Sequence, residues 1–270
     1  MQSRRSQIVN RMDIGPRVTA FGRWYLTLIL LMAENFGLRF KRSRMAVILA
    51  IVEPMGIIGL LSLVHSLIAK KAPFGTSFML FYGTGVLPYY LLFHVSLRVR
   101  SMDMLKRMPR TTEFDVLLSH VMDEFVLKLI VMILCFGSLW LLGVPDAAPV
   151  HPAQCFGAMA IFAAFGVGLG MINAVISSFL FVWSYVYSLL ARAMLMFSGV
   201  LYVLDTMPKD LRDFAVYVPF AHGVALFRSG YYGNYPALLL DVRYLLLWTI
   251  GILCFGWLLK HATREWRPTA

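Results

Sequence analysis

Charged residues are scarce in this chain of 270 residues. Lys, Arg, Asp and Glu make up 14% of the sequence, whereas hydrophobic residues make up 59%. Soluble domains carry charge on about a quarter of their residues, so this composition excludes a soluble globular protein. The length allows about six spans of about 20 residues with their connections, and no separate soluble catalytic domain. We therefore predict an all-α integral membrane protein with a single transmembrane domain over residues 1–270.

Cysteine and the common catalytic motifs are also lacking. The three cysteines, Cys135, Cys155 and Cys254, lie in or beside apolar runs and lack the paired spacing of a zinc or disulfide framework. The sequence contains no GxxxxGK[ST] phosphate loop and no DxD pair for a nucleotide sugar. We therefore expect no metal, no cofactor and no catalytic residue in this chain.

Long apolar runs are abundant. They predict six transmembrane helices, at about residues 45–67, 78–97, 125–142, 155–179, 183–203 and 244–259. Before them, residues 21–40 contain an apolar stretch of about ten residues, which is too short to cross a bilayer. Aromatic and basic residues flank this stretch, so we predict an amphipathic helix in the cytosolic interface, within a cytosolic N-terminal region over residues 1–44. Residues 1–20 show no cleavable signal sequence.

Basic residues indicate the topology. Residues 1–44, 98–110 and 260–270 together hold 17 Lys and Arg, whereas the loops assigned to the outside hold five. The positive-inside rule places both termini and the polar segment 98–124 in the cytosol. Because membrane orientation explains most of the net charge of +11, we expect no nucleic-acid partner.

The segment over residues 205–236 follows the fifth predicted span. Pro208, Pro219 and Gly230 interrupt it, so it cannot cross as one helix. Its apolar pieces predict two short re-entrant helices that form an exterior cap, because irregular backbone is tolerated at membrane depth only where protein or a cavity surrounds it.

Several separated motifs resemble the membrane subunit of type-2 ABC exporters for capsular polysaccharide. They are FKRSRMAVILAIVEPMG (40–56), TGVLPYYLLFHVSLRV (84–99), TTEFDVLLSHVMDEF (111–125) and SGVLYVLDTMPKDLRDFAVYVPFAHGVALFRSGYYGNY (198–235). Val218 and His120 depart from the family's usual Asn and Arg. The resemblance implies a permease in the bacterial inner membrane, with a lipid-linked glycan as its substrate. An exporter of O-antigen or teichoic acid shares this architecture and is the alternative.

The resemblance also implies partners. Two copies of this chain would join two cytosolic ATPase subunits, and ATP and Mg would bind those subunits only. Periplasmic or outer-membrane export proteins would continue the route. The segment 98–124 would contact the ATPase through Met102, Met104, Leu105, Lys106, Arg107, Met108 and Arg110. A solvated loop held by lipid phosphates is the other interpretation of this segment.

Three groups are candidates for the substrate path. The first is the basic cluster of Arg39, Lys41, Arg42 and Arg44, which could attract an anionic glycan or ordinary acidic lipids. The second consists of aromatic residues on which sugars could stack, although aromatics also anchor helices at membrane interfaces. These are Tyr82, Tyr89, Tyr90, Trp183 and Tyr185. The third is Arg192, half-way along the fifth predicted span, which should face a cavity or a partner.

Two further patterns have less specific meaning. The sequence GVGLG at residues 166–170 could serve packing within the subunit or dimerisation. His120 and Asp123 stand three apart, so they could lie on one helical face and polarise a hydroxyl. They are the only candidates for the less favoured hypothesis of a membrane-bound glycan acyltransferase.

Overall fold

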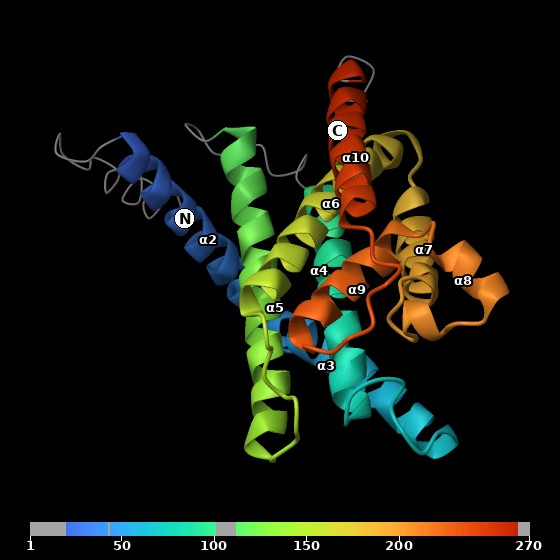
Figure 1. The fold of residues 1–270 in the computed structure, drawn as a ribbon. Coiled ribbons are helices and arrows are strands. Elements are labelled where there is room, and N and C mark those ends of the chain that lie inside the picture. Colours follow the sequence, from blue (N-terminus) through green and yellow to red (C-terminus); the bar gives the residue numbers. More distant parts are fainter. Residues whose placement is uncertain (1–19, 43, 101–111, 264–270) are drawn as a thin grey trace.

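The structure is a computed structural model that describes residues 20–42, 44–100 and 112–263. Helices are the only regular secondary structure in this part of the chain, which confirms the all-α prediction (Figure 1). Five helices are long and apolar enough to cross a membrane. They are α3 (Arg44–Ile68), α4 (Phe78–Arg100), α5 (Glu113–Leu141), α6 (Pro152–Phe179) and α10 (Val242–Ala262).

Four of these five helices begin within three residues of the predicted spans, but α5 begins at residue 113 rather than 125. A capping box explains the early start. Asp115 N donates to Thr112 Oγ1, and Thr112 N donates to an oxygen of Asp115. The second half of the polar segment 98–124 is therefore the first part of a continuous 29-residue helix.

The predicted interface helix is present as α2 (Ala20–Arg42). Its buried side chains include Leu28 and Leu31, whereas Phe21 and Tyr25, nearer its start, are exposed. Trp24 Nε1 donates a 2.9 Å hydrogen bond to an oxygen of Asp115, which joins α2 to the start of α5.

The fifth predicted span contains the shorter helix α7 (Trp183–Phe197). Its 15 residues extend about 22 Å at 1.5 Å per residue, which is less than the hydrocarbon thickness of about 30 Å. The chain then turns at Gly199, where φ is 77°, a left-handed conformation that glycine adopts without strain. The count of six spans therefore stays a prediction.

The segment after α7 folds into three short helices. They are η2 (Leu204–Thr206), α8 (Lys209–Ala215) and α9 (Pro219–Tyr231). The two short helices predicted for residues 205–236 correspond to α8 and α9. Pro219 begins α9 at a position where its missing N–H breaks no helical hydrogen bond. Residues Ala221–Gly230 of α9 are buried apart from Ser229, so this helix belongs to the core.

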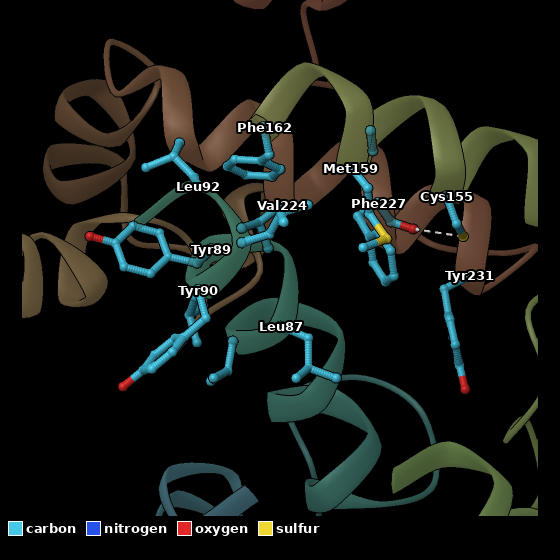
Figure 2. Packing of buried hydrophobic residues seen from close by; sticks show 14 of the residues in the cluster. Leu87, Tyr89, Tyr90, Leu92, Cys155, Met159, Phe162, Val224, Phe227 and Tyr231 are labelled. Atoms are coloured by element: carbon cyan, nitrogen blue, oxygen red, sulfur yellow. Dashed lines mark hydrogen bonds between the residues drawn. The ribbon is translucent and has the colours of Figure 1, made fainter. Parts of the chain in front are cut away.

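Helices α4 and α6 form the centre of the molecule. Figure 2 shows Phe162 of α6 close to Leu92 of α4 and Val224 of α9. Glycines let the helices approach closely, because a Cβ at Gly166 would lie 2.6 Å from Leu92 O. A Cβ at Gly168 would lie 2.6 Å from Ile252 of α10 instead. The GVGLG sequence therefore serves packing within the subunit, with alternate glycines against α4 and α10.

Figure 1 shows the N-terminal end of α5 and the C-terminal end of α10 on the upper side of the molecule. The connection that follows α5 lies on the lower side. The start of α5 and the end of α10 therefore lie on one side of the molecule, and the assignment of that side to the cytosol stays a prediction.

Candidate functional site

The tyrosines of α4 are buried. Tyr82, Tyr89 and Tyr90 are each at most 5% exposed. The Tyr89 hydroxyl donates a 2.5 Å hydrogen bond to Ala191 O of α7. Tyr90 packs edge-on against His94, one turn further along α4, with ring centroids 5.3 Å apart. Figure 2 shows the phenols of Tyr89 and Tyr90 pointing away from α6. In this conformation Tyr89 therefore holds α7, and Tyr82 offers no accessible ring face.

Further polar contacts fix one side of α7 to the core. Trp183 Nε1 donates to Asn173 Oδ1 of α6 at 3.0 Å. The hydroxyls of Tyr187 and Ser96 of α4 are hydrogen-bonded at 2.6 Å. Trp183, predicted as a path residue, thus contributes to the attachment of α7.

The other side of α7 is exposed. Tyr185, Leu189, Arg192 and Met196 follow one another at spacings of four, three and four, so they form one helical stripe. All four are exposed, and Tyr185 is 71% exposed. We call this stripe the α7 face. A helix attached along one side and exposed along the other borders either lipid or a further protein surface.

Arg192 is the charged member of the α7 face. Within the part of the chain that the structure describes, its guanidinium makes no hydrogen bond or ion pair. An arginine at the middle of a membrane helix costs at least about 2.5 kcal/mol on insertion scales, so a cavity or a partner should surround it. Tyr90 lies within electrostatic range of both Arg192 and Glu53 of α3. The three side chains therefore lie in the same part of the molecule.

An ionic cluster joins α3, α4 and α5 beside this position. Lys128 Nζ lies 2.9 Å from His94 Nδ1, and Arg98 Nε lies 2.9 Å from Glu124 Oε1. His94 Nε2 lies 3.9 Å from a carboxylate oxygen of Glu53. Lys128 and Glu124 are buried, so these contacts compensate charges that the membrane would otherwise leave unsolvated. No spacing along the chain indicates this cluster, because its members come from three helices.

Arg228 of α9 is a second feature that the sequence analysis missed. Its side chain is fully buried. Its two terminal nitrogens donate four hydrogen bonds of 2.7 to 3.0 Å to backbone carbonyls. Those carbonyls belong to Phe81 of α4 and to Gly199, Val200 and Tyr202 of the turn after α7.

The charge of Arg228 is balanced by dipoles and an aromatic ring. Its guanidinium carbon lies 3.9 Å from the centroid of the Phe81 ring, a cation–π distance. Burial raises the pKa of the neighbouring Tyr232 to about 12, so this phenol supplies no negative charge. Arg228 therefore fixes α9, the C-terminal end of α7 and the start of α4 to one another. The sequence signal was a single arginine within the apolar stretch PFAHGVALFRSGYY.

A comparison of the sequence with protein families shows the family of this chain. The model of the family described as ABC-2 type transporter matches residues 26–232. The chain belongs to the ABC-2 type transporter family. The match extends from α2 through α9, so it covers both the α7 face and Arg228.

Curated relatives of this ABC-2 chain carry names that concern capsule export. The capsule polysaccharide export inner-membrane protein CtrC of Neisseria meningitidis is 26% identical over 145 residues, and BexB of Haemophilus influenzae, with the same description, is 25% identical over 142 residues. Each alignment covers 53% of this chain and 53% of the relative, so the chain spans about half the length of these relatives. The polysialic acid transport protein KpsM of Escherichia coli is 21% identical over 244 residues, 89% of this chain and 94% of KpsM. The predicted resemblance to capsule exporters is confirmed.

Two groups of predicted site residues cannot be placed in this ABC-2 chain. Arg39, Lys41, Arg42 and Arg44 lie where α2 ends and α3 begins, but their side chains are outside the described part of the structure. The predicted ATPase contact at Met102, Met104, Leu105, Lys106, Arg107, Met108 and Arg110 lies wholly outside the described residues. Both remain predictions from the sequence.

The structure describes both residues of the acyltransferase hypothesis. His120 and Asp123 lie on α5 and are 4% and 1% exposed. A glycan hydroxyl would have no access to either side chain in this arrangement. Among the described residues, no group of three His, Cys, Asp or Glu side chains could hold a metal ion.

An apolar groove of about 410 Å³ separates α5 from α6. Ile133, Phe136 and Trp140 of α5 line one side, and Phe156 and Met159 of α6 line the other. Trp140 and Phe156 are exposed, so the groove opens at the surface of the chain. A surface of this composition suits the acyl chains of the surrounding bilayer.

Proposed function

We propose that this chain is the permease subunit of an ATP-driven exporter of capsular polysaccharide in the bacterial inner membrane. The observation that carries the proposal is the α7 face, an exposed stripe at membrane depth with an arginine and a tyrosine, in a chain of the ABC-2 family. The names of CtrC, BexB and KpsM support a capsular glycan as the substrate rather than O-antigen or teichoic acid.

Two copies of the chain enclose the path in this proposal. The exposed side chains of the α7 face, Tyr185 and Arg192, border the path, and Tyr90 lies behind them. Tyr185 offers an accessible ring on which a sugar can stack. Arg192 offers a charge that an acidic sugar or a phosphate can contact. Tyr89 and Trp183 hold α7 in place, and Tyr82 packs in the core.

Hydrolysis of ATP takes place in a separate cytosolic protein. Two copies of that ATPase bind ATP and Mg and contact the segment between α4 and α5 through Lys106, Arg107 and the neighbouring methionines. The termini share the cytosolic side with this segment. The basic cluster that ends with Arg44 attracts the anionic lipid-linked glycan at the cytosolic face, and periplasmic or outer-membrane export proteins receive the polymer.

Export can be tested in a bacterium that produces a capsule and lacks its own copy of this gene. We expect the chain, produced with its ATPase, to restore polysaccharide at the cell surface, measured with a glycan-specific antibody on intact cells. Without the chain, the glycan should accumulate inside the cell. A normal amount of polysaccharide at the surface of cells without this chain would refute the proposal.

Arg192→Gln tests the path within this assay. The variant should lower surface polysaccharide by about tenfold, because the acidic groups of the glycan lose their charged contact. The amount of the chain in the membrane should stay unchanged. The matched control is Arg243→Gln, since Arg243 is an exposed arginine at the start of α10. Normal export by Arg192→Gln would exclude Arg192 from the path.

The reversal of charge at Lys106 and Arg107 tests the ATPase contact. We expect less ATPase to co-purify with the variant chain, because these charges fix the register of the contact. Lys70→Glu and Lys71→Glu, in the loop assigned to the outer side, form the control pair. An unchanged complex with normal export would show that this segment is a solvated loop.

A further inference from the structure

The apolar groove between α5 and α6 extends through the depth of one leaflet. Along α5 its lining extends from Leu129 to Trp140, which is a rise of about 16 Å at 1.5 Å per residue. The hydrocarbon of one leaflet is about 15 Å thick, half of a core of about 30 Å. Trp140 is 65% exposed at the end of the groove that adjoins the loop after α5, where an aromatic residue suits the membrane interface. In the predicted topology, the groove therefore faces the outer leaflet.

The volume of the groove fits one hydrocarbon chain. A methylene group is about as large as a water molecule, whose share of the liquid is about 30 Å³. The groove of about 410 Å³ therefore holds about 14 methylenes, most of one phospholipid acyl chain. An α-helix with its side chains is about 10 Å across, so a single turn of 5.4 Å would already fill about 420 Å³. A helix of another protein is too thick for this groove.

The polar groups in the groove lining are already used within the chain. The hydroxyl of Tyr231 donates a 2.5 Å hydrogen bond to Ala147 O. The thiol of Cys155 donates to Phe227 O at 3.6 Å, the contact drawn as a dashed line in Figure 2. Apart from Trp140 at the mouth, the other side chains of the lining carry no N–H or O–H group. The lining therefore offers a ligand dispersion contacts with hydrocarbon.

The mouth of the groove carries a negative charge. Asp146 lies beside the lining, within electrostatic range of Tyr231. It is exposed and makes no ion pair with any described residue, including Lys70 and Lys71 of the neighbouring loop before α4. The loop over residues 142–151 itself contains no Lys or Arg. A lipid headgroup at this mouth therefore meets a carboxylate, which attracts an ammonium group.

We propose that the groove is a binding site for one phospholipid of the outer leaflet, with an acyl chain between α5 and α6 and an ammonium headgroup beside Asp146. Phosphatidylethanolamine has this chemistry. The lipid anchor of the exported glycan is another source of hydrocarbon, but its anionic glycan would be repelled by Asp146. The site goes beyond the proposed function, because it concerns the bilayer rather than the cargo. The bound chain joins α5 to α6 and also contacts α9 through Phe227.

Photolabelling of the full chain tests the site. The chain is placed in nanodiscs of phosphatidylethanolamine and phosphatidylglycerol that contain a phosphatidylethanolamine with a diazirine in one acyl chain. After illumination, mass spectrometry identifies the labelled peptides. We expect label on the groove peptides, around Phe136 of α5 and Met159 of α6. Label on the exposed face of α10, around Leu247 and Ile250, measures ordinary contact with the bilayer.

Gly137→Leu fills the groove from within the chain. Gly137 belongs to the lining, and a Cβ placed on it meets nothing within 4 Å. Leu has a higher helix propensity than Gly, so the variant should fold. It should lower the label on the groove peptides by about tenfold, which corresponds to about 1.4 kcal/mol of lost binding. The label on α10 should stay unchanged.

Gly157→Leu is the matched control. A Cβ on Gly157 of α6 also meets nothing within 4 Å, but Gly157 is outside the groove lining. This variant should label like the original chain. Equal labelling of the groove in all three proteins, or an equal loss in both variants, would overturn the site.

Asp146→Asn tests the headgroup. In the original chain, the ethanolamine probe should label the groove about threefold more than a phosphatidylglycerol probe with the same chains, a preference of the size that an exposed ion pair gives. The variant should label equally with both probes, and Asn tolerates the φ of 62° at this position. Equal labelling of the original chain by both probes would refute the ammonium headgroup.

A second copy of the chain is the alternative occupant. Copies with Gly137→Cys and Cys254→Ala would then be cross-linked to one another by a bismaleimide, and the groove would stay unlabelled by the lipid probe. That result would overturn the proposal. None of these measurements depends on export. A labelled groove in a chain that does not restore surface polysaccharide would therefore retain the lipid site and remove the proposed cargo.

Discussion

Arg228 and Arg192 are two arginines in opposite environments. Arg228 is fully buried and donates four hydrogen bonds to backbone carbonyls of its own chain. Arg192 is exposed on α7 and makes no hydrogen bond or ion pair with the described residues. Both concern the same short helix, because Arg192 belongs to α7 and Arg228 binds the turn that ends it.

The region around Arg228 is held by contacts within the chain, whereas the region along α3 and α7 presents exposed surface to its surroundings. Around Arg228, hydrogen bonds join α9 to α4 and to α6. Along α3 and α7, apolar surface and two charges remain exposed. Substitutions in the first region should affect folding, whereas substitutions in the second should affect assembly and transport.

The largest effect on stability should follow from Arg228→Met. The change removes the arginine donors from four buried carbonyls, of which Phe81 O keeps the hydrogen bond from Thr84 Oγ1. Each carbonyl left without a donor costs about 1–3 kcal/mol, so most of the chain should fail to reach the folded state. The amount of chain in the membrane and the midpoint of thermal unfolding in detergent measure this effect. Arg228→Lys should be intermediate, since an ammonium cannot reproduce the planar fork of a guanidinium.

Arg243→Met is the control for this experiment because Arg243 is exposed. It should unfold at the same temperature as the original chain. If Arg228→Met were equally stable, Arg228 would not hold the C-terminal end of α7, and the contrast with Arg192 would disappear.

A smaller loss should follow from Gly170→Ala. The new Cβ would lie 2.5 Å from Val99 Cβ and 2.8 Å from Ser96 O, so α4 and α6 must separate. Overpacking of this kind costs about 1–3 kcal/mol, measured as a lower unfolding midpoint. Gly157→Ala on the same helix is the matched control, since its Cβ meets nothing within 4 Å. That control should be neutral or more stable, and equal losses in both variants would refute the packing argument.

The smallest effect should follow from Tyr187→Phe. The change removes the hydrogen bond to Ser96 and keeps the ring, so stability should fall by about 1 kcal/mol. Tyr185→Phe, on the exposed α7 face, provides the comparison and should leave the unfolding midpoint unchanged. If the two variants behaved alike, the attached and exposed sides of α7 would not differ in energy.

Much of the fold could be predicted from the sequence because each span is defined locally. Apolar length alone predicts α3, α4, α6 and α10, and the interruptions at Pro208, Pro219 and Gly230 predict short helices in place of one span. The predicted start of α5 is too late because four acidic residues interrupt its first three turns, and the contact between Thr112 and Asp115 reveals that the helix has already begun. The length of α7 depends on a turn that Arg228 holds from 29 residues further along the chain.

The candidate site was less accessible to prediction. Arg192 was recognised because a charge interrupts an apolar run, which is a local signal. The aromatic residues Tyr89 and Tyr90 were recognised together, yet their neighbours differ, since only Tyr89 reaches the backbone of α7. The cluster of Glu53, His94 and Lys128 arises where three helices meet, so no pattern along the chain could indicate it.

The length of α5 has a mechanical consequence. Its 29 residues extend about 43 Å, and the hydrocarbon core is about 30 Å thick, so α5 either protrudes by about 13 Å or leans strongly. No proline interrupts it. Its capped start follows directly on the segment proposed to contact the ATPase, and its far end borders the apolar groove beside α6. A sideways displacement applied at the capped start would therefore travel along one stiff rod and change the width of that groove, so the lipids beside the groove would be displaced as well.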